Sequence, residues 1–156
     1  MIERLARATL YDQDFFEWTQ ETARLVREGR FAEVDLEAVA EEIESLGRSD
    51  RRQLGNRLQV LIMHLLKWQM QPQRRSGSWA ATIVEQRLRL EYLLRDSPSL
   101  RLCVPSFAGD VYPHAVEKAV YQMRLIKNPF PLQCPYTASE ILDRSFYPSV
   151  EGEKPW

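Results

Sequence analysis

The sequence is short of the residues that build metal sites, disulfide frameworks and membrane spans. It has two cysteines and two histidines in 156 residues. Cys103 and Cys134 form no Cys-x-x-Cys pair, so neither a disulfide framework nor a dedicated metal site is expected. The longest apolar run, Val60–Leu66, is interrupted by His64 and is far shorter than the roughly 18 residues of a spanning helix. The first residues lack a secretory signal. We therefore expect a cytoplasmic protein that has no membrane span, metal or other cofactor.

The sequence also lacks the motifs of several common enzyme classes. It contains no glycine-rich phosphate loop, no Gly-x-Ser-x-Gly turn and no His-Glu-x-x-His pair. Carboxylate-bridged metal bundles need Glu-x-x-His pairs, which are missing too. These absences favour a non-enzymatic role and leave a less common active site open.

What is present is typical of one globular domain, which we expect to span residues 1–156: 44% of residues are hydrophobic and 28% are charged. The charge is unevenly distributed. Residues 1–47 hold five Lys/Arg and twelve Asp/Glu, whereas residues 48–95 hold ten and three. The basic block could attract nucleic acid or an acidic partner. The excess negative charge of residues 1–47 equals the excess positive charge of residues 48–95. We therefore favour neutralisation of one block by the other within the fold.

Apolar residues recur at helical spacing throughout the chain before Asn128, which predicts an all-α protein. Asp14 and Glu17 fit a capping box, and Gly29 is placed to end that helix. The expected architecture is an up-and-down helical bundle with one long central helix and an extended Pro-rich C-terminal tail. We expect kinks or breaks at Pro105 and Pro113, and a frayed end at 151–156. A capping box at Thr137 and Glu140 predicts a short helix through Leu142.

The long central helix is predicted from Leu36 to about Gln71, where Pro72 stops it. Its apolar stripe keeps one phase across Gly47, so a single helix is favoured over two short ones. We assign the whole stripe to the core. Its members are Leu36, Val39, Ala40, Ile43, Leu46, Leu54, Leu58, Leu61, Leu65 and Trp68.

Polar residues interrupt the apolar stripes of two predicted helices. The candidate polar cluster consists of Glu42, Asp50, Arg57 and His64 on the long helix, and Gln86 and Arg87 on the next. A buried charge is costly unless it is paired, so we expect Asp50, Arg57, His64 and Arg87 to form one connected network. A structural network is favoured over a ligand-binding or catalytic cleft and over a partner-facing surface.

A second candidate lies where the long helix ends. The candidate interaction surface comprises Trp68, Gln71, Arg74, Arg75 and Trp79. Two tryptophans with arginines between them could stack on bases or dock a peptide. The alternative, which we favour, is a connection whose tryptophans close the end of the bundle.

Several segments in order resemble one known family. They are Tyr11-Asp12-Gln13-Asp14-Phe15 with Trp18, Glu41-Glu42-Ile43-Glu44-Ser45-Leu46-Gly47, His64-Leu65-Leu66-Lys67-Trp68, Gln71-Pro72, Ser78-Trp79, Thr82-Ile83, Arg87, Ser97-Pro98-Ser99-Leu100, Cys134-Pro135-Tyr136 and Ile141-Leu142-Asp143. Over about residues 9–148 the chain resembles the bacterial and cyanobacterial family called domain of unknown function 29. The resemblance implies a compact helical domain and brings no activity or catalytic residues with it.

The sequence is compatible with three functions. The first is a non-enzymatic helical interaction module that associates with itself or with a protein partner. The second is a nucleic-acid-binding protein that uses the basic region 48–89. The third is a small enzyme with a polar cleft around Asp50, His64 and Arg87. The sequence favours the first.

Overall fold

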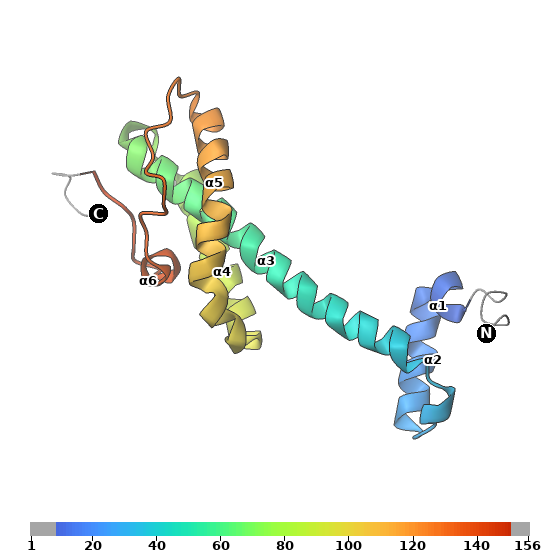
Figure 1. Ribbon diagram of the computed structural model, residues 1–156. Coiled ribbons are helices and arrows are strands. Elements are labelled where there is room, and N and C mark those ends of the chain that lie inside the picture. Colours follow the sequence, from blue (N-terminus) through green and yellow to red (C-terminus); the bar gives the residue numbers. More distant parts are fainter. Residues whose placement is uncertain (1–8, 151–156) are drawn as a thin grey trace. The chain divides into compact units, whose positions relative to one another are not determined.

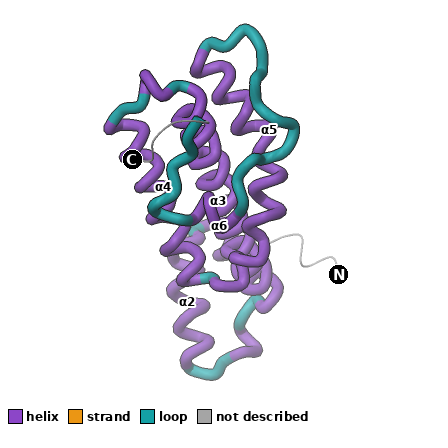
Figure 2. The backbone as a smooth tube through the Cα atoms, turned by 90° about the vertical axis from the view of Figure 1, so that its left-hand side faces the viewer, coloured by secondary structure: helices purple, strands orange, loops and turns teal. Residues whose placement is uncertain are grey.

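The computed structural model describes residues 9–150, and this part of the chain is helix and loop with no strand (Figure 2). The all-α prediction is therefore confirmed. The chain divides into two compact units, unit 1 at Met1–Arg48 and unit 2 at Ser49–Trp156. The single domain expected over residues 1–156 stays a prediction. The end expected to fray, 151–156, lies outside the described residues.

Unit 1 is a small helical unit that begins with two short helices and a single 3₁₀ turn. These elements are α1 (Leu10–Gln13), α2 (Phe15–Arg27) and η2 (Phe31–Glu33). The Asp14 carboxylate accepts the Glu17 N–H at 2.9 Å, which caps α2. Gly29 follows at φ +72°, the left-handed conformation that ends a helix most easily with glycine. The predicted start and stop of this helix are both confirmed.

Helix α3 (Leu36–Met70) is a single helix, as the unbroken phase of its stripe predicted. The Asp35 carboxylate accepts the Ala38 N–H at 3.1 Å and caps its first turn. Pro72 opens the 3₁₀ turn η3 (Pro72–Arg74), because proline disfavours the helical conformation of the residue before it. The C-terminal half of α3 is the centre of unit 2.

Unit 2 packs two long helices against the C-terminal half of α3 (Figure 1). Its further elements are α4 (Gly77–Asp96), η4 (Pro98–Cys103), α5 (Val104–Met123) and α6 (Ala138–Leu142). Leu54, Leu58 and Leu61 are completely buried in its core. Gly55 lies where α5 comes close, since a Cβ there would be 3.4 Å from Cδ1 of Phe107. Unit 2 therefore has the helical bundle that the periodicity predicted.

Helix α5 continues through Pro113, so of the kink or break expected at that residue the break does not occur. Pro105 lies in the first turn of α5, where the missing N–H has no partner to lose. Pro113 is exposed, while its neighbours Tyr112 and Ala115 are buried in the core. Packing on both sides therefore holds the helix through a residue that removes one hydrogen bond.

The tail of unit 2 runs without regular structure from Arg124 to the capping residue of α6. The Thr137 hydroxyl accepts the Glu140 N–H at 3.2 Å, and the Glu140 carboxylate accepts the Thr137 N–H at 2.8 Å. This confirms the predicted capping box. Tyr136 and Ile141 are buried against the bundle, so the tail completes the core of unit 2.

Candidate functional site

Asp50 and Arg57 of the candidate polar cluster line an open pocket of about 310 Å³ between α3 and α4. Asp50 accepts a hydrogen bond from the Ser97 hydroxyl at 3.1 Å. Arg57 donates a long one, 3.4 Å, to Oε1 of Gln86. Arg89 and Asp96 also line the pocket, so its wall carries both signs of charge. These two residues are therefore half-buried and face water.

Arg87 lies in the interior of unit 2 and faces the tail. Arg87 is only 3% exposed, and its Nε donates to the Ile141 carbonyl at 2.9 Å. Nη2 donates to the Glu140 carbonyl at 3.3 Å, and the guanidinium lies 5.5 Å from the Tyr147 ring centre. Burial lowers the pKa of Arg87, and Nη1 is buried without a hydrogen-bond partner. Arg87 thus supplies donors to the last carbonyls of α6.

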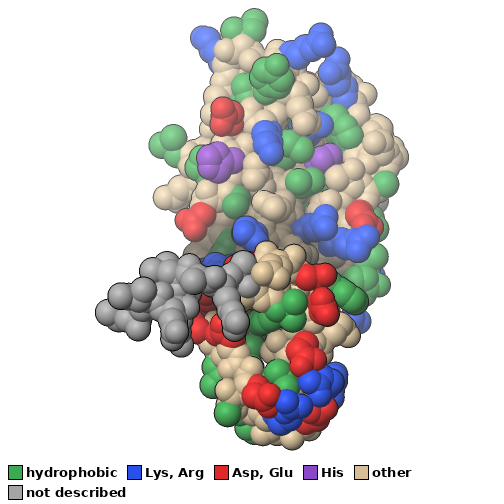
Figure 3. All heavy atoms as spheres, turned by 90° about the vertical axis from the view of Figure 1, so that its right-hand side faces the viewer, with side chains coloured by type: hydrophobic (Ala, Val, Ile, Leu, Met, Phe, Trp, Pro, Cys, Tyr) green, Lys and Arg blue, Asp and Glu red, His purple; other side chains and the backbone are tan. Residues whose placement is uncertain are grey.

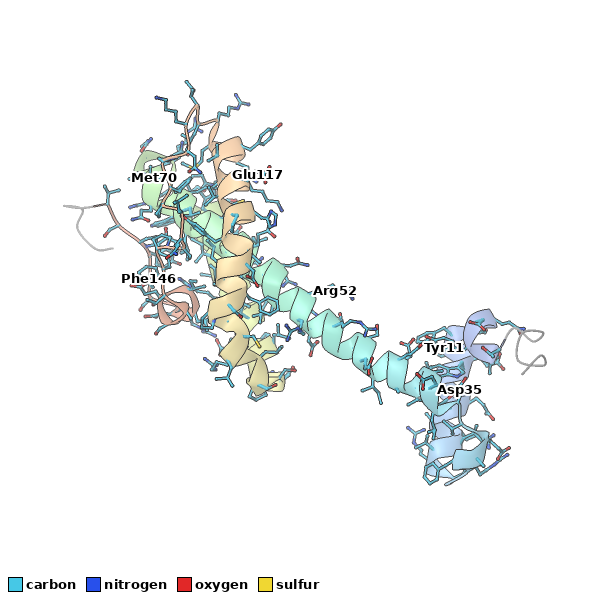
Figure 4. The ribbon with its side chains drawn as sticks, in the orientation of Figure 1. Tyr11, Asp35, Arg52, Met70, Glu117 and Phe146 are labelled. Carbon is cyan, nitrogen blue, oxygen red and sulfur yellow. The ribbon has the colours of Figure 1, made fainter. Side chains whose placement is uncertain are left out.

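His64 and Glu42 each have a different local partner. Nδ1 of His64 lies 2.9 Å from the Val60 carbonyl one turn earlier in α3, and burial lowers the histidine pKa. The Tyr11 hydroxyl donates to Glu42 at 2.5 Å, and this bond raises the pKa of Tyr11 to about 12. Glu42 therefore belongs to unit 1, where Tyr11 turns toward the start of α3 (Figure 4).

The single connected network expected of Asp50, Arg57, His64 and Arg87 is wrong. Among residues 9–150, the only hydrogen bond between two members of the candidate polar cluster joins Arg57 to Gln86. The physical reason is that backbone groups and a hydroxyl satisfy the others. The carbonyls at the end of α6 need donors, and Arg87 supplies them. The cluster is therefore a set of separate contacts.

The candidate interaction surface is mostly occupied by contacts within unit 2. Trp68 is 7% exposed and its ring lies 5.0 Å from that of Tyr147. The Arg75 guanidinium lies 5.2 Å from the centre of the Trp68 ring, and its Nε donates to the Trp68 carbonyl at 2.8 Å. Trp79 and Gln71 are half-buried, and Arg74 is exposed. These contacts close the end of the bundle around Trp68.

Sequence reasoning gave no role to Lys67, which is 8% exposed in the structure. Its Nζ donates to Oε1 of Gln122 at 2.9 Å and lies 4.5 Å from the centre of the Trp79 ring. Burial lowers its pKa. The amine therefore ties α3 to α4 and α5. The only signal in the sequence was its place beside Trp68, among consecutive apolar residues of the long helix.

Two kinds of site can be assessed directly on the described residues. Among residues 9–150, no group of three or more His, Cys, Asp and Glu side chains lies close enough together to hold a metal ion. Within the same range, no helix combines the length and hydrophobicity required to cross a membrane. The sites that remain are the open pockets, among them the one beside Asp50 and one of about 490 Å³ beside His114, and the exposed surfaces.

The matched family covers most of the chain. The family described as Domain of unknown function DUF29 matches residues 10–147. The chain belongs to this family. Comparison with curated proteins and with solved structures gave no match. The DUF29 match includes α1 to α6, and therefore all the site residues named above, and confirms the family that the sequence resembles. The function of the family is unknown.

Proposed function

We propose that this DUF29 chain is a helical interaction module that binds another protein chain and catalyses no reaction itself. The observation that carries the proposal is an apolar surface on the first third of α3. It consists of Leu36, Ile43 and Leu46, which are 63%, 63% and 69% exposed, and we call it the exposed stripe. At 3.6 residues per turn these three side chains share one side of the helix.

The expectation that the whole apolar stripe of α3 is core is wrong for its first third. Leu54, Leu58 and Leu61, farther along the same helix, are completely buried, whereas Leu36, Ile43 and Leu46 are not. Burying a leucine or isoleucine contributes about 1.5–3 kcal/mol. Regularly spaced apolar side chains left in water are typical of a helix face that a partner covers.

The geometry around the polar residues supports a non-enzymatic role. His64 bonds to the carbonyl of its own helix, and Arg87 is enclosed by the tail. Asp50 accepts from Ser97, whose hydroxyl is the nearest candidate nucleophile, but neither contacts a histidine. A nucleophile needs a base within hydrogen-bonding distance. The third function, an enzyme centred on Asp50, His64 and Arg87, is accordingly not favoured.

Contacts of the basic region also weigh against nucleic-acid binding. Of its side chains, Lys67 and Arg87 are buried. Arg89 pairs with Glu85 at 2.7 Å, and Arg51 lies 5.1 Å from the centre of the Phe107 ring. Electrostatic binding to phosphates needs accessible Lys and Arg side chains.

We place the protein in the cytoplasm, where its two free thiols would stay reduced.

Site-specific photo-crosslinking in cells of the source organism tests the proposal. A benzoylphenylalanine at position 43 of the full chain should give a discrete adduct with another chain, identified by mass spectrometry. The same residue at position 102 is the matched control, because Leu102 is 88% exposed but lies in unit 2. Leu36→Gln combined with Leu46→Gln should abolish the adduct. Equal adducts at both positions, or none, would contradict the proposal.

A further inference from the structure

The exposed stripe lies on a part of α3 that carries carboxylates and no basic side chain. Residues 36–47 contain four glutamates and no Lys or Arg. On the helix surface Asp35 and Glu42 run along one edge of the exposed stripe, and Glu37 and Glu44 run along the other. Figure 3 shows acidic, basic and hydrophobic side chains together on the surface of unit 1.

The carboxylates of α3 are much less neutralised than those of α2. Arg24 pairs with Glu21 and Glu28 at 2.6 and 2.7 Å, and Arg30 pairs with Glu28 and Glu33. These contacts lower the pKa of all three glutamates.

On α3 the situation differs. Among the described residues Glu37 has no ion pair, and Glu44 reaches only Arg48, at 3.7 Å between side chains that are 73% and 61% exposed. The charge of Glu37, and most of that of Glu44, is therefore left for a partner, whereas Asp35 caps α3 and Glu42 accepts from Tyr11.

We propose, resting on the proposed interaction function, that the exposed stripe binds an amphipathic helix of another protein whose apolar face is edged by Lys and Arg. Apolar side chains supply the contact area, and the cationic edge meets Glu37 and the weakly paired Glu44. Leu36 and Leu46 are ten positions apart, about 15 Å along the helix, so the matching segment is about three turns long.

Charge separates this partner from two other occupants of the same surface. A second copy that offered its own exposed stripe would place glutamates against glutamates, which is unfavourable. An anionic lipid surface would be repelled by the same side chains. A cationic helix is the occupant for which both the apolar and the charged features are favourable.

Binding of two synthetic peptides to the full chain tests the inference. Both peptides are about 18 residues long, with leucines at helical spacing, and carry either lysines or glutamates along the edges of the leucine face. We expect the lysine-edged peptide to bind at least about tenfold more tightly in fluorescence anisotropy, and the preference to shrink as salt is raised.

Two matched pairs of variants assign the effect to this surface. Ile43→Gln with Leu46→Gln should lower the affinity at least about tenfold, whereas Leu102→Gln should leave it unchanged. Glu37→Lys with Glu44→Lys should reverse the charge preference. Asp110→Lys with Glu117→Lys changes the net charge equally at two exposed positions of α5 and should preserve the preference. Circular dichroism confirms that each variant is folded.

The outcomes separate the inference from the proposed function. Equal binding of the two peptides would overturn the charge argument and leave an apolar docking surface. No binding of either peptide would overturn the inference, while the crosslinking experiment decides the proposed function independently. A dimer that is seen in sedimentation and lost in Ile43→Gln would overturn the inference. The occupant of the exposed stripe would then be a second copy of the chain. Binding to phosphatidylglycerol vesicles that requires Leu46 would also overturn the inference of a cationic helix as the partner.

Discussion

Arg87 illustrates, at the scale of one residue, how a buried cation is held without a carboxylate. Its hydrogen bonds go to the carbonyls of Glu140 and Ile141 at the end of α6. Those carbonyls have no partner inside the helix, and a cation near a helix C-terminus is also favoured by the helix dipole. A buried arginine can therefore be a structural capping residue, and its burial alone does not mark a catalytic site.

We predict that Arg87→Met destabilises unit 2. The change leaves the buried Ile141 carbonyl and the half-buried Glu140 carbonyl without these donors, and an unsatisfied buried group costs about 1–3 kcal/mol. On the order of 3 kcal/mol is expected, which corresponds to a fall in melting temperature of about 6–12 °C. Thermal denaturation measures it, and hydrogen exchange should show loss of protection in α6.

Arg89→Met is the matched control for this prediction. Arg89 is two residues away on the same helix, but its exposed ion pair with Glu85 contributes less than about 1 kcal/mol. Arg87→Met with a melting temperature equal to that of Arg89→Met would show that Arg87 does not hold the tail.

At the scale of secondary structure, the positions of the helix ends are determined locally in the sequence. Caps and stops lie within a few residues of the helix that they bound, so Asp14, Gly29, Pro72 and Thr137 identified their helix ends correctly. The break expected at Pro113 did not occur, because packing of neighbouring side chains outweighs a local preference.

The polar cluster shows what periodicity leaves out. The phase of a helix places Arg87 on a stripe but does not say which element that stripe meets. Its partners, Glu140 and Ile141, are more than fifty residues away in sequence. For the same reason the phase of α3 predicted burial equally well for Ile43 and Leu61, although only Leu61 is buried. The exposed stripe became visible only in the structure.

Two glycines in unit 1 should respond oppositely to alanine. Gly47 lies inside α3 with open space around the position of a Cβ, so Gly47→Ala should stabilise the helix by about 0.5–1 kcal/mol. Gly29 has φ +72°, so Gly29→Ala should destabilise the end of α2 by about 1 kcal/mol. Hydrogen exchange at α3 and α2 measures both. Faster exchange in Gly47→Ala would mean that α3 requires flexibility there.

At the scale of the whole molecule, the basic block of the sequence is not a free cationic surface. Of its ten Lys and Arg side chains, Lys67 and Arg87 are buried and Arg57 and Arg75 are half-buried, whereas the other six are exposed. Among the exposed six, Arg89 and Arg95 lie beside carboxylates and Arg51 lies over the Phe107 ring. The pattern of charge along the sequence therefore overstates the accessible positive charge by the side chains that are buried.

We predict that the full chain binds duplex DNA weakly and without sequence preference. Lys67 and Arg87 are buried, and Arg89 and Arg95 have neighbouring carboxylates, so dissociation constants weaker than about 10 µM are expected near physiological salt. Fluorescence anisotropy with two unrelated duplexes measures this. Sub-micromolar affinity with a steep salt dependence would contradict the prediction and favour the region 48–89 as a nucleic-acid interface.

The hold of Arg87 on α6 also has a consequence for the order in which unit 2 folds. A helix of five residues does not persist alone in water, because nucleation costs more than so few hydrogen bonds return. Helix α6 can therefore form only after α4 has presented Arg87 to its carbonyls. Contacts between residues so far apart in sequence also form late, because closing the intervening loop costs entropy. The tail is thus the last part of unit 2 to fold, and Tyr136 and Ile141 stay exposed until it does.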